Sequence, residues 1–396
     1  MSLTSRLESN FIREYNETFS FTYFIGPPNA LSSCAHSQQA ELFVSRMASF
    51  ISYSSEFNSL IGYKSEIKLI ASRPVSVPFA HEGGAFVPTT NEVWFTANQL
   101  PIQNTNVSRV NLETNQIELL SIQPSILTPN GANYFDDSVY ICSQGNQTTS
   151  GGIYAVNPTT LVSRLVVNSW FGLRLNSPND VTFTRKIGRG KYMWFTDPQV
   201  AYMQDFGSLP QLGSYVYRFD LTTSELRPVI TDLVVPNGIA FDLNETTLYV
   251  SDTAPSSYGH GTFMVYAYDL NKHGLPINRH VFSVSSAGIP DGIKVDKMGR
   301  VWTGEGDGIN VRDHHGTLLG VILGRDLCQI DKMGRVWTGE GDGINVRDHH
   351  GTLLGVILGR DLCQSGVISN FAIVGNLVII LAQEKVWRLE LATSVL

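Results

Sequence analysis

Five residues with side-chain oxygens recur at the same position of a short motif along this chain. The motif is a proline followed by Asn or Asp and then by Gly or Asp, and His81-Glu82-Gly83-Gly84 opens the first repeat in a related way. The five residues are Glu82, Asn130, Asn179, Asn237 and Asp291. Two carboxylates and several amide carbonyls form the kind of hard oxygen ligand set that Ca²⁺ prefers, and Mg²⁺ or Mn²⁺ also bind such sets. If the fold brings the five together, the sequence predicts a divalent metal site.

The same motif also has an interpretation that requires no metal. Proline and glycine pre-set the dihedral angles of turns, and asparagine tolerates the left-handed region of backbone space. A single copy, such as Pro129-Asn130-Gly131, therefore indicates a turn more strongly than a ligand. Five oxygen-bearing residues in one register favour the metal site.

The repeats that contain these residues predict a β-propeller. Each motif is followed by a short strand rich in β-branched and aromatic residues, and most units contain a further strand after it. The strands that follow the motifs are 92–96, 139–142, 193–196, 248–251 and 301–303. Short strands separated by turn signals, in units of about 50 residues, are typical of a propeller with one four-stranded blade per unit.

The number of units predicts an all-β, six-bladed propeller over residues 61–396, after an N-terminal extension of residues 1–60. The last unit supplies only three strands, over 371–375, 377–383 and 386–391. A strand near 66–71 would supply the fourth and remove a free sheet edge by closing the ring. Because the innermost strands of a propeller line its central channel, the five motif residues are expected to converge on one axis.

A second repeat is of a different kind. Residues 296–329 and 331–364 are identical, whereas the blades elsewhere share only a few positions, so this is a recent duplication or an assembly error. We expect a six-bladed ring with one copy displaced. The alternative is that the copy forms an extra blade, which would widen the channel far beyond the ligand distances of about 2.3–2.6 Å that Ca²⁺ requires.

Composition and charge exclude several classes of function. The net charge is −7 and only 16% of residues are charged, so no basic surface for nucleic acid or anionic membrane is expected. The sequence shows neither an apolar run long enough to span a bilayer nor a convincing signal peptide. A cytoplasmic protein is the default expectation, and four Asn-X-Ser/Thr sequons make secretion the alternative. No partner protein is indicated.

Four stretches around the motif residues resemble the gluconolactonase/regucalcin (SGL) family of six-bladed propellers, with the closest likeness to fungal lactonohydrolases. They are His81-Glu82, Ser177-Pro-Asn-Asp-Val, Val235-Pro-Asn-Gly-Ile-Ala and Ile289-Pro-Asp-Gly-Ile-Lys-Val-Asp. The resemblance implies a divalent ion at the channel floor, usually Ca²⁺, with Mg²⁺, Mn²⁺ or Zn²⁺ as alternatives. The ligands that it implies are Glu82, Asn179, Asn237 and Asp291, with Asn130 beside them. Regucalcin-like members carry Arg where this chain has Ser177, so the likeness does not extend to substrate handling as in regucalcin.

The resemblance implies lactone hydrolysis, with a sugar-acid or similar hydroxylated lactone as the small-molecule substrate. The ion would polarise the carbonyl, and Asp291, or failing that Glu82, would act as general base on the attacking water. Asn130 and Asn179 would orient the substrate, and His81 would either contact it and move protons or serve only a structural role. The alternative is a non-catalytic propeller that keeps a metal for stability and serves as a binding scaffold. A strictosidine-synthase-like propeller is a third option, but that relative lacks the ligands present here.

Overall fold

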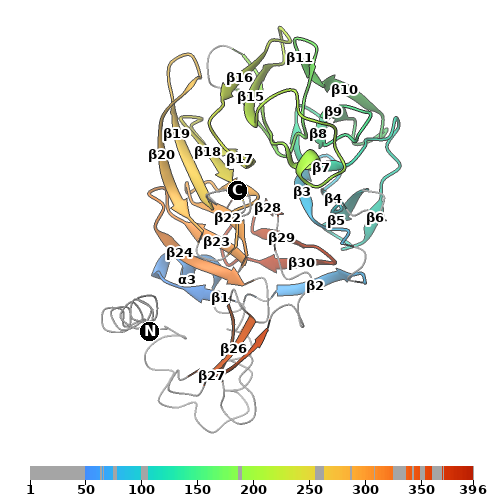
Figure 1. Cartoon of the computed structure of the whole chain (residues 1–396). Coiled ribbons are helices and arrows are strands. Elements are labelled where there is room, and N and C mark those ends of the chain that lie inside the picture. Colours follow the sequence, from blue (N-terminus) through green and yellow to red (C-terminus); the bar gives the residue numbers. More distant parts are fainter. Residues whose placement is uncertain are drawn as a thin grey trace, which may run out of the picture. The chain divides into compact units, whose positions relative to one another are not determined.

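In the computed structural model, six antiparallel sheets are arranged as the blades of a ring (Figure 1). The predicted six-bladed, all-β propeller is confirmed. The structure describes residues 50–62, 65, 67–74, 78–99, 106–185, 190–254, 263–285, 288–306, 308–323, 336–340, 343–347, 353–358, 368 and 370–395.

The first three blades are each built from four consecutive strands. Blade 1 contains β3 (Glu82–Val87), β4 (Glu92–Thr96), β5 (Val107–Asn111) and β6 (Ile117–Leu119). Blade 2 contains β7 (Pro129–Phe135), β8 (Ser138–Ser143), β9 (Gly152–Val156) and β10 (Ser163–Val167). Blade 3 contains β13 (Val181–Thr184), β14 (Tyr192–Asp197), β15 (Tyr215–Asp220) and β16 (Leu226–Ile230). In each blade the first strand is the innermost one.

The remaining blades follow the same order, except that the last takes one strand from earlier in the chain. Blade 4 contains β17 (Pro236–Phe241), β18 (Thr247–Asp252), β19 (Met264–Leu270) and β20 (Pro276–Val284). Blade 5 contains β21 (Ile293–Val295), β22 (Val301–Glu305), β23 (Gly308–Arg312) and β24 (Leu318–Leu323). Blade 6 contains β28 (Asn370–Val374), β29 (Leu377–Ala382), β30 (Lys385–Glu390) and β2 (Ile67–Ser72).

Strand β2 closes the ring. It pairs antiparallel with β30, with Ile67 opposite Leu389 and Lys68 opposite Arg388. The innermost strands contact one another in a full circuit, from β3 through β7, β13, β17, β21 and β28 back to β3. The predicted closure by a strand near residues 66–71 is therefore confirmed.

Large side chains on the second strands fill the space between blades. Trp94, Trp194 and Trp302 lie in β4, β14 and β22 and are completely buried. The indole Nε1 of Trp194 donates to Thr184 Oγ1 at 3.0 Å, so this ring is buried without losing its hydrogen bond. The aromatic and β-branched pattern thus packs the face of one sheet against the next.

Blade 5 carries two further elements on its outer side. β1 (Phe50–Ser52) pairs with β24 as a fifth strand, and α3 (Ser55–Ile61) follows it. The Ser54 hydroxyl caps α3 by accepting from the Phe57 backbone N–H at 3.0 Å. β1 and all of α3 except Ile61 belong to residues 1–60, the segment assigned to the N-terminal extension, and both elements pack on the propeller.

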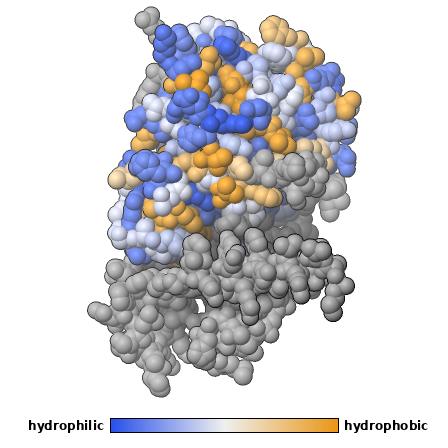
Figure 2. All heavy atoms as spheres, turned by 60° about the vertical axis from the view of Figure 1, so that its left-hand side comes forward, coloured by the Kyte–Doolittle hydropathy of each residue, from blue (hydrophilic) through white to orange (hydrophobic). Residues whose placement is uncertain are grey.

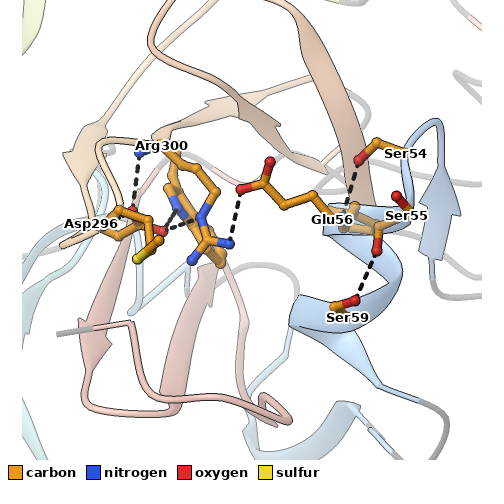
Figure 3. A network of polar contacts seen from close by, with 9 residues as sticks. Ser54, Ser55, Glu56, Ser59, Asp296 and Arg300 are labelled. Atoms are coloured by element: carbon orange, nitrogen blue, oxygen red, sulfur yellow. Dashed lines mark hydrogen bonds and ion pairs between the residues drawn. The ribbon is translucent and has the colours of Figure 1, made fainter.

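An ionic contact also ties α3 to blade 5. Figure 3 shows the Glu56 carboxylate reaching the Arg300 guanidinium, at 3.4 Å between Oε1 and Nη1. Arg300 Nε donates in turn to Asp296 Oδ2 at 2.7 Å. Phe57 of α3 lies in the apolar core that blades 5 and 6 share, so α3 is held by burial as well as by charge.

The second copy of the duplicated segment does not form a blade. Strands β25 (Val336–Glu340), β26 (Gly343–Arg347) and β27 (Leu353–Leu358) pair with one another in a separate three-stranded sheet. Blade 5, built from the first copy, packs directly on blade 6, where the rings of Trp302 and Phe371 have centroids 6.5 Å apart. The ring therefore contains one copy, as predicted.

Smaller elements lie outside the blades. β11 (Ser169–Trp170) pairs with β12 (Leu173–Arg174), and α4 (Val200–Met203) follows β14. Figure 2 shows hydrophilic and hydrophobic residues interspersed on one face of the described part. Among the described residues, no helix has the length and apolar character needed to cross a membrane.

Candidate metal centre

The five oxygen-bearing residues of the motif lie at equivalent places near the start of the innermost strands. Glu82 begins β3, and Asn130 and Asn237 are the second residues of β7 and β17. Asn179 and Asp291 lie two residues before β13 and β21. All five are buried, with at most 9% of any one exposed. Because the innermost strands contact one another around the ring, the fold gathers these residues at one end of the channel.

Hydroxyl groups on the second strands hold the backbone of this site in place. Thr96 Oγ1 donates to the Asn130 carbonyl at 3.0 Å, Thr196 Oγ1 to that of Asn237 at 2.7 Å, and Ser251 Oγ to that of Asp291 at 2.8 Å. In each case the hydroxyl belongs to one blade and the carbonyl to the next. The sequence signal was the Thr or Ser at the end of these strands, which our sequence analysis did not connect with the site.

The glycine of the motif serves close packing rather than a turn. Gly131 and Gly238 lie within strands β7 and β17, and neither has a positive φ. A Cβ atom at Gly131 would collide with the Asn179 carbonyl oxygen, and one at Gly238 would collide with that of Asp291. The strand pairing is also bulged around both glycines, and bulges redirect side chains. The turn interpretation is therefore wrong at these two copies.

Two carboxyl groups meet at the centre of the site. Asp291 and Glu82 interact closely enough that the protonation of one affects the pKa of the other. Burial, together with the charges of Asp291 and Asp180, raises the pKa of Glu82 well above its usual value. Burial likewise raises the pKa of Asp291 to about 7. Asn370 Nδ2 donates to Glu82 Oε2 at 2.7 Å and partly offsets this effect.

Several buried oxygens of the site lack hydrogen-bond donors. They are Asn130 Oδ1, Asn179 Oδ1, Asp180 Oδ2, Asn237 Oδ1 and Asp291 Oδ1. A buried acceptor left unpaired costs about 1–3 kcal/mol, so five together call for a positively charged ligand. No group of three or more His, Cys, Asp and Glu among the described residues is arranged to hold a metal, so amide oxygens would have to complete the set. Carboxylate and amide oxygens of this kind fit a hard divalent cation.

His81 lies at the edge of the site and is fixed by blade 6. Gln383 Nε2 donates to His81 Nδ1 at 2.7 Å, and Gln383 Oε1 accepts from Asn98 Nδ2 at 3.2 Å. The ring proton is therefore on Nε2, which is 3.8 Å from Glu82 Oε1. Burial lowers the pKa of His81 to about 4, so the ring is neutral near pH 7.

A family model of the SMP-30/gluconolactonase/LRE-like region matches residues 80–324, which include His81 and every predicted ligand. The chain belongs to the SMP-30/gluconolactonase/LRE-like family. The resemblance found in the sequence is thus confirmed.

Individual relatives agree with this family. Lactonohydrolase oryH of Aspergillus oryzae is 27% identical over 312 residues, which are 60% of this chain and 66% of that protein. The gluconolactonase of Zymomonas mobilis is 29% identical over 199 residues, which are 48% and 52% of the two chains. The chain therefore spans less than two thirds of the length of either relative. The solved gluconolactonase of Xanthomonas campestris has the same fold, with a TM-score of 0.64 at 23% identity over 86% of this chain and 94% of that one.

Three residues of this SMP-30/gluconolactonase-like site were not assigned to it from the sequence. Asp180 is buried beside Asn179 and occupies the motif position that is glycine in other repeats. Asn370 begins the innermost strand of blade 6, at the sixth equivalent position, and its identity as an Asn was the available signal. Lys294 of β21 lines a channel cavity of about 360 Å³, and it received no role although it lies in the stretch 289–296 that carries the family resemblance.

Proposed function

We propose that this chain is a lactonase that opens a small hydroxylated lactone, of the sugar-acid type, with the help of a divalent cation. The observation that carries the proposal is the convergence of buried, unpaired oxygens of Asn179, Asn237 and Asp291 from three blades. The relatives named lactonohydrolase and gluconolactonase support a lactone as the substrate.

The residues proposed to hold the cation are Glu82, Asn179, Asn237 and Asp291, and their hard oxygens suit Ca²⁺ best. A cation bound there would supply positive charge that polarises the lactone carbonyl and stabilises the developing oxyanion. Asn130, whose Oδ1 is unpaired, and Asn179 are proposed to orient the lactone. Neutral His81 can donate its Nε2 proton to a substrate hydroxyl.

Asp291 is our choice for the general base. Without a cation its pKa is about 7, and a bound cation would lower that pKa, so Asp291 would be ionised near neutral pH and able to take a proton from water. The water oxygen bonds to the carbonyl carbon, the ring C–O bond breaks, and the proton passes from Asp291 to the departing alkoxide. The product is the open hydroxy acid. Glu82, whose pKa is raised further, is the second candidate for this role.

A panel of aldonolactones, assayed with and without a chelator, tests the proposal. We expect ring opening that the chelator abolishes and Ca²⁺ restores, and a loss of about 10²–10³-fold in kcat/KM for Asp291→Asn. The matched control is Asp220→Asn, a half-buried residue at the end of β15 whose Oδ1 accepts from Thr222 and Thr223 backbone N–H groups, a role that Asn also fills. Chelation that lowers thermal stability in a chain that opens no lactone would instead support the binding scaffold.

A further inference from the structure

Lys294 brings a positive charge to the cavity beside the buried acids. Lys294 lies in the innermost strand β21 and is half-buried. The cavity that it lines also contacts Gly84 and Thr182, each two positions along its strand from the acids Glu82 and Asp180. The cavity therefore lies two residues along these strands from the acids.

Lys294 acts on these acids through space. Its charge lowers the pKa of both Glu82 and Asp180, opposing the effect of burial. Within the described part of the chain, the Lys294 ammonium has no hydrogen bond and no ion pair. Its charge is thus directed at the channel rather than neutralised by one neighbour.

We propose that Lys294 is a positioning residue whose fixed charge balances the acidic cluster of Glu82, Asp180 and Asp291 and sets its affinity for the cation. When ionised, the cluster carries three negative charges, and a divalent cation together with one ammonium neutralises them. Buried charges are tolerated only when they are balanced in this way. The inference rests on the proposed cation, and it assigns Lys294 as the partner of Asp180, which is not a proposed ligand.

Calcium titration of the metal-free full chain by calorimetry at pH 8 tests this role. We expect Lys294→Met to bind Ca²⁺ about tenfold more tightly than the original chain, because a like charge near the ion is gone, and Lys294→Arg to bind within about twofold of it. Unchanged or weaker binding by Lys294→Met would overturn the proposal.

A second measurement separates failure of this inference from failure of the proposed function. Without metal at pH 8, Lys294→Met should melt several degrees below the original chain, because the buried acids Glu82 and Asp180 lose their counter-charge, whereas Lys294→Arg should not. If no variant binds a divalent ion but this difference is present, the metal-dependent lactonase proposal fails, and Lys294 keeps only its role of balancing the buried acids. Equal melting of Lys294→Met and the original chain would reject that role.

The identical copies carry a separate inference about blade 5. Each contact that holds β22 to β24 in the ring is made by a residue that the second copy repeats. Trp302 contacts Phe371, and its counterpart in the second copy is Trp337. Arg300 contacts Glu56, and its counterpart is Arg335. The strands β25 to β27 also pair with one another in the same register as β22 to β24.

We infer that either copy can complete blade 5. β21 precedes both copies and β28 follows both, so the chain order permits either one to enter. In the observed arrangement residues 324–369 connect β24 to β28; in the other, residues 296–335 would connect β21 to β25. The contacts within the ring would be the same, and loop closure depends only on the logarithm of loop length. The two arrangements should therefore be populated within about threefold of each other.

Single and paired substitutions test the exchange. In a chain lacking residues 330–364, Trp302→Ala should lower the Tm by about 10 °C, because a buried Trp is lost. In the full chain the same substitution should lower it by less than about 3 °C, since the second copy replaces the first. Trp337→Ala alone should change little, and the double variant should match the shortened chain.

An equal loss for Trp302→Ala in the full and the shortened chain would overturn the exchange. If the shortened Trp302→Ala chain does not fold, the milder pair Ile309→Val and Ile344→Val gives the same comparison. Ile309 is completely buried in blade 5, and Ile344 is its counterpart in the second copy.

Discussion

Six buried acids of this propeller form two sets that lie equally deep but differ in their hydrogen bonds. The framework acids, Asp197, Asp252 and Asp296, accept bonds on both carboxylate oxygens. In the cluster acids, Asp180 and Asp291 each have one oxygen without a donor, and Glu82 accepts a hydrogen bond from Asn370. All six are at most 8% exposed. Incomplete hydrogen bonding, not depth, separates the site from the framework.

The largest expected contrast is between Asp252→Asn and Asp291→Asn in metal-free protein. Asp252 accepts from the Val234 and Val235 backbone N–H groups at 3.1 and 2.8 Å. An amide there would set an NH₂ group against one of those donors, so the free energy of unfolding should fall by about 3–4 kcal/mol. Asp291→Asn removes a repelling charge and should leave that free energy equal or higher. Urea unfolding at pH 7 with a chelator measures both, and similar losses would erase the distinction between the two sets.

The pH dependence of stability sharpens the contrast within the metal-free protein. Asp291 has a pKa of about 7 when folded and an ordinary value of about 4 when unfolded, so the folded state binds the proton more tightly. The contribution of Asp291 to the free energy of unfolding is complete below pH 4 and is lost as pH rises towards 7. The free energy of unfolding should fall by an amount on the order of 3 kcal/mol over this range. Thermal unfolding between pH 4 and 8 in chelator should show this fall, and Asp291→Asn should remove part of it.

The control for that experiment is a framework acid. Burial also raises the pKa of Asp197 to about 7, so Asp197 likewise makes the free energy of unfolding fall as pH rises. Asp291→Asn should leave the Asp197 contribution in place and so reduce the slope without flattening it. Identical slopes in the two proteins would contradict the raised pKa of Asp291.

Added Ca²⁺ should stabilise the original chain through the cluster acids alone. At a free concentration of one hundred times Kd, a ligand that binds only the folded state adds about 2.7 kcal/mol. In a thermal-shift experiment Ca²⁺ should raise the Tm of the original chain and of Asp220→Asn, and it should leave the Tm of Asp291→Asn unchanged. A shift that persists in Asp291→Asn would place the ion elsewhere.

The smallest expected effect concerns the hydroxyls that anchor the site. Thr196 Oγ1 donates to the Asn237 carbonyl and accepts from the Asp180 backbone N–H at 3.0 Å. Thr196→Val should cost about 1–2 kcal/mol of stability and weaken Ca²⁺ binding several-fold, because the backbone of two site residues loses its anchor. Thr184→Val is the matched control, since its buried hydroxyl accepts from Trp194 away from the cluster. It should lose stability without changing Ca²⁺ affinity.

Much of this architecture could be predicted because it repeats. The strands, their order, the closing strand and the register that gathers Glu82 and Asp291 are all properties of a pattern along the chain. Lys294 and the anchoring role of Thr196 could not be found in the same way. Their partners lie on other blades, and a sequence pattern does not show which side chains meet across a blade interface. Gly131 shows the same limit, because its requirement comes from the neighbouring Asn179 carbonyl.

The pairing of β2 with β30 has a consequence during synthesis. β2 leaves the ribosome before any of the six innermost strands, and its partner Lys385–Glu390 follows all of them. Until then β2 presents an unpaired edge, and until residue 370 is made Glu82 has no Asn370 beside it. A nascent chain released before residue 370 would therefore lack both the closed ring and the last supporting residue of the site. Assembly of the site should thus be among the last events in the making of this protein.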